Sequence, residues 1–254
     1  MGEGVAIELD LIVAIAAAFV TSIIGALSGF GGGVLVMPFL VPVVGIKGVV
    51  PVMSIAMLIA NFSRFWVYRA EVRSDVLVRL GLASLPGVIL GTYIYQLLPD
   101  VAIATLIGLF LIGSIGLRRG LKGRALQFGP NGTAAWSFGF GVLTGSTPGA
   151  GVVLVVLLLG MGMSGPALIA TDAVIGMLSS VTKAAMFSTF DLLDLRSLAI
   201  GLLVGLATIP GAFTARWMIN NLSASVHVML IEAMVIVAGL SFLWRAWSTQ
   251  IGAT

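Results

Sequence analysis

The chain has 254 residues, of which 59% are hydrophobic and 9% charged, with a formal net charge of +3. Soluble domains carry about 25% charged residues, so this composition excludes a soluble enzyme and predicts a polytopic membrane protein with a mean hydropathy of +1.16. The basic residues fit membrane topology better than nucleic-acid binding. Because the chain has no cysteine, thiol chemistry and disulfides are excluded. Its single histidine excludes a multi-histidine metal site within one chain.

The hydrophobic segments follow an acidic N-terminus without a cationic region, so we expect the first segment to stay in the mature protein. A membrane-spanning helix needs about 20 apolar residues. Seven stretches approach or exceed this length: 7–28, 48–68, 76–97, 101–117, 165–189, 195–219 and 223–247. Three shorter stretches lie beside glycine clusters at 29–33 and 145–151: they are 33–44, 134–146 and 151–160. The glycine clusters therefore predict broken or half-length helices.

Short sequence patterns recur in the same order at an offset of about 116 to 124 residues. The matching pairs are Gly25-Ala-Leu-Ser-Gly29 with Gly141-Val-Leu-Thr-Gly145, Gly45-Ile-Lys-Gly48 with Gly162-Met-Ser-Gly165, Ser54 with Thr171, and Pro86-Gly87 with Pro210-Gly211. Four ordered matches indicate an internal duplication. We expect two transmembrane repeats of about five hydrophobic segments each, 1–117 and 133–254, joined by a polar linker at 118–132.

Lysine and arginine set the expected orientation, because they are enriched in cytoplasmic loops. The 64–79 region holds four arginines and the 118–132 linker holds four basic residues, whereas the N-terminus has none. Both basic regions therefore read as cytoplasmic and the N-terminus as external. The first repeat then crosses an odd number of times, so the second repeat is inverted. The expected fold class is an all-α, multi-pass protein of two inverted-topology repeats in the cytoplasmic (inner) membrane.

The glycine clusters also predict an anion site. A broken helix leaves free N–H groups and a positive dipole end, and both bind anions. We expect backbone and hydroxyl groups of the two clusters to converge on one pocket: Ser28, Gly31, Gly32 and Gly33 from the first, and Ser146, Thr147, Gly149 and Gly151 from the second. The alternative is that these glycines only permit close helix packing. If packing is their only role, replacing Gly32 with a bulky residue should weaken anion binding no more than the same replacement at Gly108. We expect Gly108 on an ordinary helix face.

Polar residues inside the hydrophobic segments are the other candidates, because they usually face the bundle interior or a cavity. Those expected to bind substrate are Ser54, Asn61, Arg64, Thr171 and Lys183. Arg64 and Lys183 could instead extend to the membrane interface. Asp172 could form a buried hydrogen bond or ion pair that holds helices together, be neutralised by Lys183 about three helical turns away, or carry a proton. Glu232 and His227 are expected at the membrane interface.

The pattern Gly25-x-x-x-Gly29-x-Gly-Gly-Gly33-x-x-x-x-Pro38, with its diverged copy from Gly141 to Gly151, resembles the sulfite exporter TauE/SafE family. The likeness covers nearly the whole chain. It implies a permease that exports small sulfur-containing anions, such as sulfite or organosulfonates. In the second copy Ser146-Thr147-Pro148 replaces part of the family's glycine pattern, and no proline follows within 152–159. This departure bears on the choice of substrate.

Secondary transport is the leading function, and the alternatives are an anion channel or a permease for another small oxyanion or carboxylate. An intramembrane enzyme needs an acid–base or nucleophile constellation, which one histidine and few buried carboxylates do not supply. The chain also lacks a Gly-x-x-x-x-Gly-Lys-[Ser/Thr] loop for ATP. We therefore expect no enzymatic activity, cofactor, metal or nucleic acid. The expected partners are a small anion and the lipid bilayer, and the sequence leaves the oligomeric state open.

Overall fold

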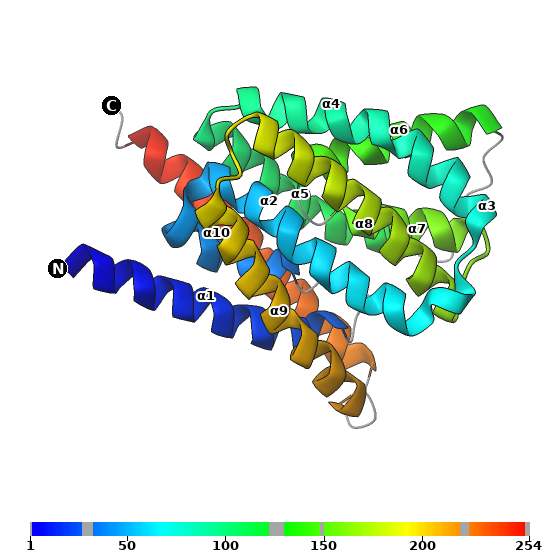
Figure 1. Ribbon diagram of the computed structural model, residues 1–254, viewed down its shortest axis with the longest axis horizontal. Coiled ribbons are helices and arrows are strands. Elements are labelled where there is room, and N and C mark those ends of the chain that lie inside the picture. The colour runs from blue at the N-terminus through cyan, green and yellow to red at the C-terminus, as the bar shows by residue number, and fades with distance from the viewer. Residues whose placement is uncertain (1, 27–32, 122–129, 148–149, 219–223, 252–254) are drawn as a thin grey trace.

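The structure is a computed structural model that describes residues 2–26, 33–121, 130–147, 150–218 and 224–251. These residues form a bundle of helices and contain no strand. The helix α1 begins and α10 ends on the same side of the bundle (Figure 1). Four of the described helical stretches are long and apolar enough to cross a membrane: Leu35–Glu71, Ser74–Leu97, Asp100–Leu117 and Gly165–Thr189.

The helices follow the hydrophobic segments expected from the sequence. Their bounds are α1 (Gly2–Ala26), α2 (Gly33–Tyr68), α4 (Ala83–Leu97), α5 (Asp100–Leu121), α6 (Pro130–Ser146), α7 (Gly151–Gly160), α8 (Gly165–Thr189), α9 (Leu195–Met218) and α10 (Ala224–Ile251). Three short elements join α2 to α4: the 3-10 turn η1 (Arg69–Glu71), the single-turn α3 (Ser74–Val76) and the π-helical η2 (Leu77–Leu82). The π-helical turn precedes Pro86, whose ring clashes with the carbonyl four residues earlier and so favours a wider turn there.

Two short helices each end at a glycine with positive φ. Within α2, Gly45 has φ +70 and ψ 169 and separates the segment 33–44 from the rest of the helix. The ten-residue α7 is followed by Gly162, with φ +79. Side chains rarely adopt this backbone conformation, so glycine is required at both points. The clusters 29–33 and 145–151 lie partly outside the described residues, so helix breaks at those clusters stay a prediction.

The helices α2 and α8 run side by side through the middle of the bundle, with α4 and α6 on one side and α1 and α9 on the other (Figure 1). One apolar core cluster draws residues from α1, α2, α5, α9 and α10, and a second draws them from η2, α6 and α7. The helix α8 contributes to both, through Phe187 to the first and Ile175 to the second. The α2–α8 interface therefore lies at the centre of the fold.

The helices α4 and α6 meet through glycines. A Cβ atom added at Gly87 or Gly91 would overlap the carbonyl oxygen of Phe138 or Val142, and one at Gly141 would overlap that of Ser84. Small residues at four-residue spacing allow helices in membranes to approach this closely. At Gly141 and Gly145, close packing is therefore the structural role of the repeated glycine pattern.

The expectation that Gly108 lies on an ordinary helix face is wrong. An added Cβ there would lie 2.8 Å from the carbonyl oxygen of Gly239, because α5 packs tightly against α10 at this point. Hydropathy separates apolar from polar faces but does not show which apolar face meets another helix. Gly113 has no atom within 4 Å of an added Cβ and is the suitable control position on α5.

The ends of α5 and α10 are joined by an ion pair. Arg119 donates from Nε to Glu232 at 3.2 Å and makes a second contact through its terminal nitrogen. The Glu232 side chain is 11% exposed, so this carboxylate is buried in the protein at an interface between helices. The His227 side chain lies outside the described residues.

Candidate functional site

The helix α8 carries a buried polar face. Asp172, Gly176, Ser179 and Lys183 follow one another at spacings of four, three and four residues, which places them on one side of a helix. The three residues with side chains are each at most 6% exposed. The helix α2 packs along α8, so this face forms part of the central interface.

At one end of the α2–α8 interface, Arg64 joins the two helices. Its Nη1 donates to Oδ2 of Asp172 at 3.1 Å, and its Nη2 donates to Oδ1 of Asn61. Asn61 is 3% exposed and packs against Gly176, where an added Cβ would overlap the amide. The structure thus brings together three residues expected to be functional. The ion-pair partner of Asp172 among the described residues is Arg64 rather than Lys183.

A second hydrogen bond ties the same turn of α8 to the first half of the chain. The backbone N–H of Arg73, in the connection after α2, donates to Oγ1 of Thr171 at 3.1 Å. Thr171 is fully buried. Two consecutive residues of α8 therefore hold both the end of α2 and the segment that follows it.

Three hydroxyl groups expected to bind the anion are engaged locally. Ser54 donates to the carbonyl of Pro51 at 2.6 Å. Ser146 and Thr147 donate to the carbonyls of the preceding turn of α6, at 2.8 and 2.7 Å. Serine and threonine in helices often bond the preceding turn in this way. These hydroxyl protons are not available to an anion in this conformation.

The expected convergence of the two glycine clusters stays a prediction. Gly33, at the start of α2, is buried, and a Cβ there would lie 2.8 Å from Cε of Met53 and 2.5 Å from Sδ of Met57. Gly151, at the start of α7, is exposed and has no atom near an added Cβ. The remaining members of the clusters lie outside the described residues: Ser28, Gly31, Gly32 and Gly149.

Lys183 is buried and has neither a hydrogen bond nor an ion pair with any described residue. An unpaired ammonium is costly to bury, by several kcal/mol even after the protein relaxes. Two buried hydroxyl oxygens in the described part of the chain also lack partners, Oγ of Ser179 and Oγ1 of Thr144. Ser179 lies one helical turn from Lys183, so α8 presents two unpartnered donors on its buried face.

Ser179 and Thr144 were not predicted from the sequence. The spacing of Ser179, four residues before a lysine within a hydrophobic segment, is a signal that could have found it. Thr144 carries no such signal, because a threonine in an apolar helix usually bonds the preceding turn. Only packing shows that its hydroxyl lacks a partner.

The sequence profile of the family described as Sulfite exporter TauE/SafE matches residues 14–242. The chain belongs to this family. TauE/SafE proteins are membrane transporters rather than enzymes. No curated protein and no solved structure matches the chain. The matched region includes all of α2 and α8, so the buried polar face lies within it.

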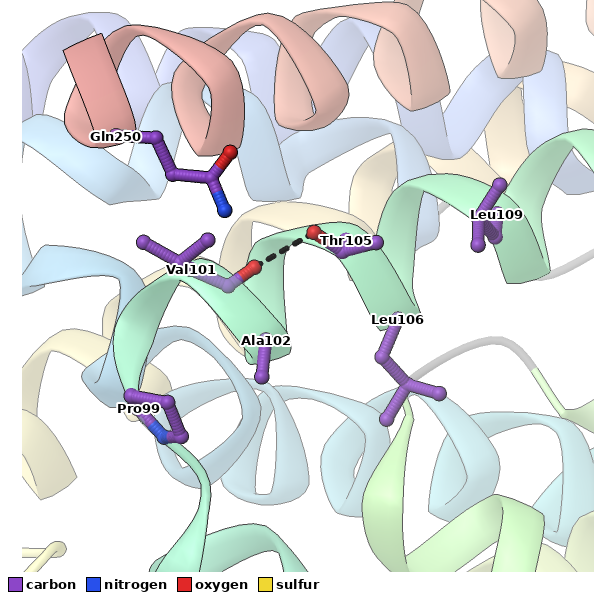
Figure 2. A pocket seen from close by; sticks show the side chains of 7 residues that line it. All are labelled: Pro99, Val101, Ala102, Thr105, Leu106, Leu109 and Gln250. Atoms are coloured by element: carbon purple, nitrogen blue, oxygen red, sulfur yellow. Dashed lines mark hydrogen bonds between the residues drawn. The ribbon is translucent and has the colours of Figure 1, made fainter.

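A groove elsewhere on this TauE/SafE protein contains none of the expected site residues. It has a volume of about 640 Å³ and lies between α5 and the end of α10 (Figure 2). It is lined by Pro99, Val101, Ala102, Thr105, Leu106, Leu109 and Gln250. The Thr105 hydroxyl is bonded to the carbonyl of Val101 at 2.7 Å, and the lining is mostly apolar. This groove is not suited to binding a small anion.

Proposed function

We propose that the protein is a secondary transporter that exports small sulfur oxyanions, such as sulfite or organosulfonates, across the cytoplasmic membrane. The anion binds at the α2–α8 interface beside Lys183. The observation that carries this proposal is Lys183, a lysine with only 6% of its surface exposed that no described residue pairs. An oxyanion supplies the missing charge, and the unpartnered Ser179 hydroxyl supplies a hydrogen bond one turn away.

The register of the two helices supports a link between Lys183 and the first glycine cluster. Arg64 opposes Asp172 and Asn61 opposes Gly176, so α2 and α8 are antiparallel. Continuing this register brings Lys183 level with the α2 turn that begins at Met53. Gly33 packs against Met53 and Met57, so the start of α2 is close to the same level. The free N–H groups of a helix N-terminus favour an anion there, and we propose Gly31, Gly32 and Ser28 as its further ligands.

We also propose that residues 1–117 and 133–254 are inverted repeats joined by the linker 118–132. The helix contacts support a two-fold relation: α1 packs on α9 as α6 packs on α4, while α2 pairs with α8 and α5 with α10. Gly45 and Gly162, which match in sequence, share a positive φ. With the linker in the cytoplasm, a cysteine at Gly123 should be labelled only from that side, and the native chain has no competing thiol.

Export is the direction that the membrane potential favours. The cell interior is negative, and each charge moved across 100 mV is worth about 2.3 kcal/mol. An anion therefore leaves without a coupling ion. Proton-linked transport through Asp172 is the second candidate, since this carboxylate is buried within the bundle. Asp172→Asn should then retain anion binding and lose the pH dependence of flux; a variant that transports with unchanged pH dependence contradicts the proton role.

The test of the anion site is Lys183→Met in the purified protein. Methanesulfonate and sulfite binding, measured by calorimetry, should weaken at least 100-fold, about 2.8 kcal/mol at 1.4 kcal/mol per tenfold change. The melting temperature should hold or rise, because methionine removes an unpaired buried charge. The control is Arg196→Gln, which removes an exposed cation at the start of α9 and should bind normally.

Unchanged binding by Lys183→Met would contradict the site. Flux that fails to saturate with anion concentration would favour the channel alternative over a carrier.

A further inference from the structure

The Arg64–Asp172 ion pair closes one end of the interface that holds the proposed anion site. The two ends of the pair differ in exposure: the Arg64 side chain is 31% exposed and the Asp172 side chain 8%. Arg64 thus reaches from the surface to a buried carboxylate. Thr171 accepts the backbone N–H of Arg73 at the same turn. Both polar interactions across this end, this hydrogen bond and the ion pair, therefore depend on residues 171 and 172 of α8.

Arg64 can bind an anion while it is still held in place. A guanidinium has five N–H donors, and the described contacts use two of them, one to Asp172 and one to Asn61. Arg64 lies about one helical turn before the end of α2 at Tyr68, so an anion arriving from the aqueous side of this end can reach the exposed part of the side chain. Because a guanidinium pairs with other oxyanions as well as with carboxylates, such an anion competes with Asp172 for the same group.

Losing Arg64 would leave Asp172 charged, buried and unpaired, which is strongly unfavourable in a closed interface. The carboxylate regains favourable solvation if this end of α2 moves away from α8 and water enters. An anion that captures Arg64 thus destabilises the closed arrangement and stabilises an open one. An anion shifts such an equilibrium only through this difference in binding between the two states.

We propose that Arg64 and Asp172 form a gate operated by the substrate: the anion takes Arg64 from Asp172, and the α2–α8 interface opens at this end toward Lys183. The proposal rests on the proposed function. It assigns the gate to the side of the membrane that holds the connection from Arg69 to Arg79, which the charge distribution predicts to be cytoplasmic. Asp172 and Lys183 are eleven residues apart on α8, so the gate lies about 16 Å from the anion site.

The experiment uses Ser180→Cys in the cysteine-free chain as a reporter. Ser180 is 2% exposed and lies about two helical turns inside the gate. A membrane-impermeant maleimide is added to the face that holds Arg73, with methanesulfonate as the anion because it does not react with the reagent. Labelling should be slow without anion and rise at least tenfold with saturating methanesulfonate, but not with equal ionic strength of gluconate.

Variants of the pair separate the gate from the binding site. In the reporter background, Asp172→Asn removes the carboxylate that drives opening, so labelling should no longer rise with methanesulfonate. The single variants Arg64→Asp and Asp172→Arg place two like charges at this end and should label fast, and the double variant that exchanges the two charges should restore slow labelling. The matched control is Asp75→Asn, which removes the neighbouring exposed pair with Arg73 and should change nothing.

Labelling of Asp172→Asn that still rises with methanesulfonate, or fast labelling in the charge-exchanged protein, overturns the gate while leaving the proposed function intact if methanesulfonate still binds. The gate is also overturned if methanesulfonate binds to the reporter protein without making its labelling faster. If methanesulfonate and sulfite do not bind to the reporter protein at all, the proposed function fails, and substrate operation of the gate fails with it.

Discussion

The α4–α6 and α2–α8 interfaces both depend on glycine, but what faces the glycine differs. In α4–α6, an added Cβ at Gly87, Gly91 or Gly141 would overlap a backbone carbonyl oxygen of the other helix. In α2–α8, an added Cβ at Gly176 would overlap the side-chain amide of Asn61. Backbone cannot yield without moving a helix, whereas a side chain can rotate.

This difference separates a fixed part of the bundle from a part able to rearrange. The α4–α6 interface relies on close backbone contact, and its buried hydroxyls at Ser84 and Thr92 bond their own helix. The α2–α8 interface contains an ion pair, an amide and a buried lysine. Polar groups have alternative partners, including water and substrate, so we assign transport-related movement to α2–α8 and a static role to α4–α6.

The largest expected effect is that of Gly141→Leu on folding. The added side chain forces α4 and α6 apart, and overpacking of this kind costs about 3 kcal/mol or more when backbone has to move. Yield after size-exclusion chromatography and melting temperature in detergent should both fall sharply. Gly139→Leu is the matched control, since Gly139 lies on the same helix with no atom within 4 Å of an added Cβ. Equal loss for both variants would contradict a specific role for the glycine contact.

A smaller effect is expected from Gly176→Ala in the α2–α8 interface. Asn61 has to rotate away, which costs about 1 kcal/mol and removes a contact that positions Arg64. A second substitution, Asn61→Ala, should recover most of the lost melting temperature, because the obstacle is a side chain. No side-chain substitution on α4 should rescue Gly141→Leu. If Asn61→Ala does not restore the melting temperature of Gly176→Ala, the proposed difference between the α2–α8 and α4–α6 interfaces is contradicted. Gly116→Ala, at an open position on α5, is the control.

The smallest effect is expected outside both interfaces, at Asp194 before α9. Oδ1 of Asp194 accepts the backbone N–H of Ser197 at 2.7 Å, and hydrogen bonds from the Ser197 side chain and backbone hold the pKa of Asp194 below its ordinary value of 3.8. A lowered pKa stabilises the fold above pH 3.8, and this contribution disappears as pH falls through the lowered pKa. Asp194→Ala should therefore slightly lower the melting temperature at pH 7, and the difference from the unsubstituted protein should shrink as pH falls below 3.8. A difference that persists at low pH would contradict the capping role.

Hydropathy was sufficient to place the helices along the chain. The expected segments 165–189 and 151–160 coincide with α8 and α7, because apolar length and flanking glycines are local properties of the sequence. Helix faces were harder to assign. Gly108 was placed on an open face and contacts α10, since one sequence does not show which apolar surfaces meet.

Only part of the candidate site was predicted, because one sequence does not show which helix surfaces meet. Asn61 and Arg64 were expected to share a helix face, and both contribute to one hydrogen-bonded group. Their partner Asp172 lies 108 residues from Arg64, a separation over which sequence pattern carries no pairing information. The hydroxyls of Ser146 and Thr147 were expected to face an anion, but they bond the preceding turn. The unpartnered Ser179 depends on packing by other helices.

The contact between α1 and α9 also sets the order in which the chain completes its fold during synthesis. α1 leaves the ribosome first, and α9 begins only at Leu195. In the complete fold α1 also contacts α2, but until α9 is made we expect the surface of α1 that meets α9 to face lipid. Lipid solvates such an apolar helix as well as a neighbouring helix does, so the delay carries little hydrophobic penalty. A chain that stops before α9 therefore inserts without completing its bundle, and its exposed α1 surface is what membrane quality-control proteases would encounter.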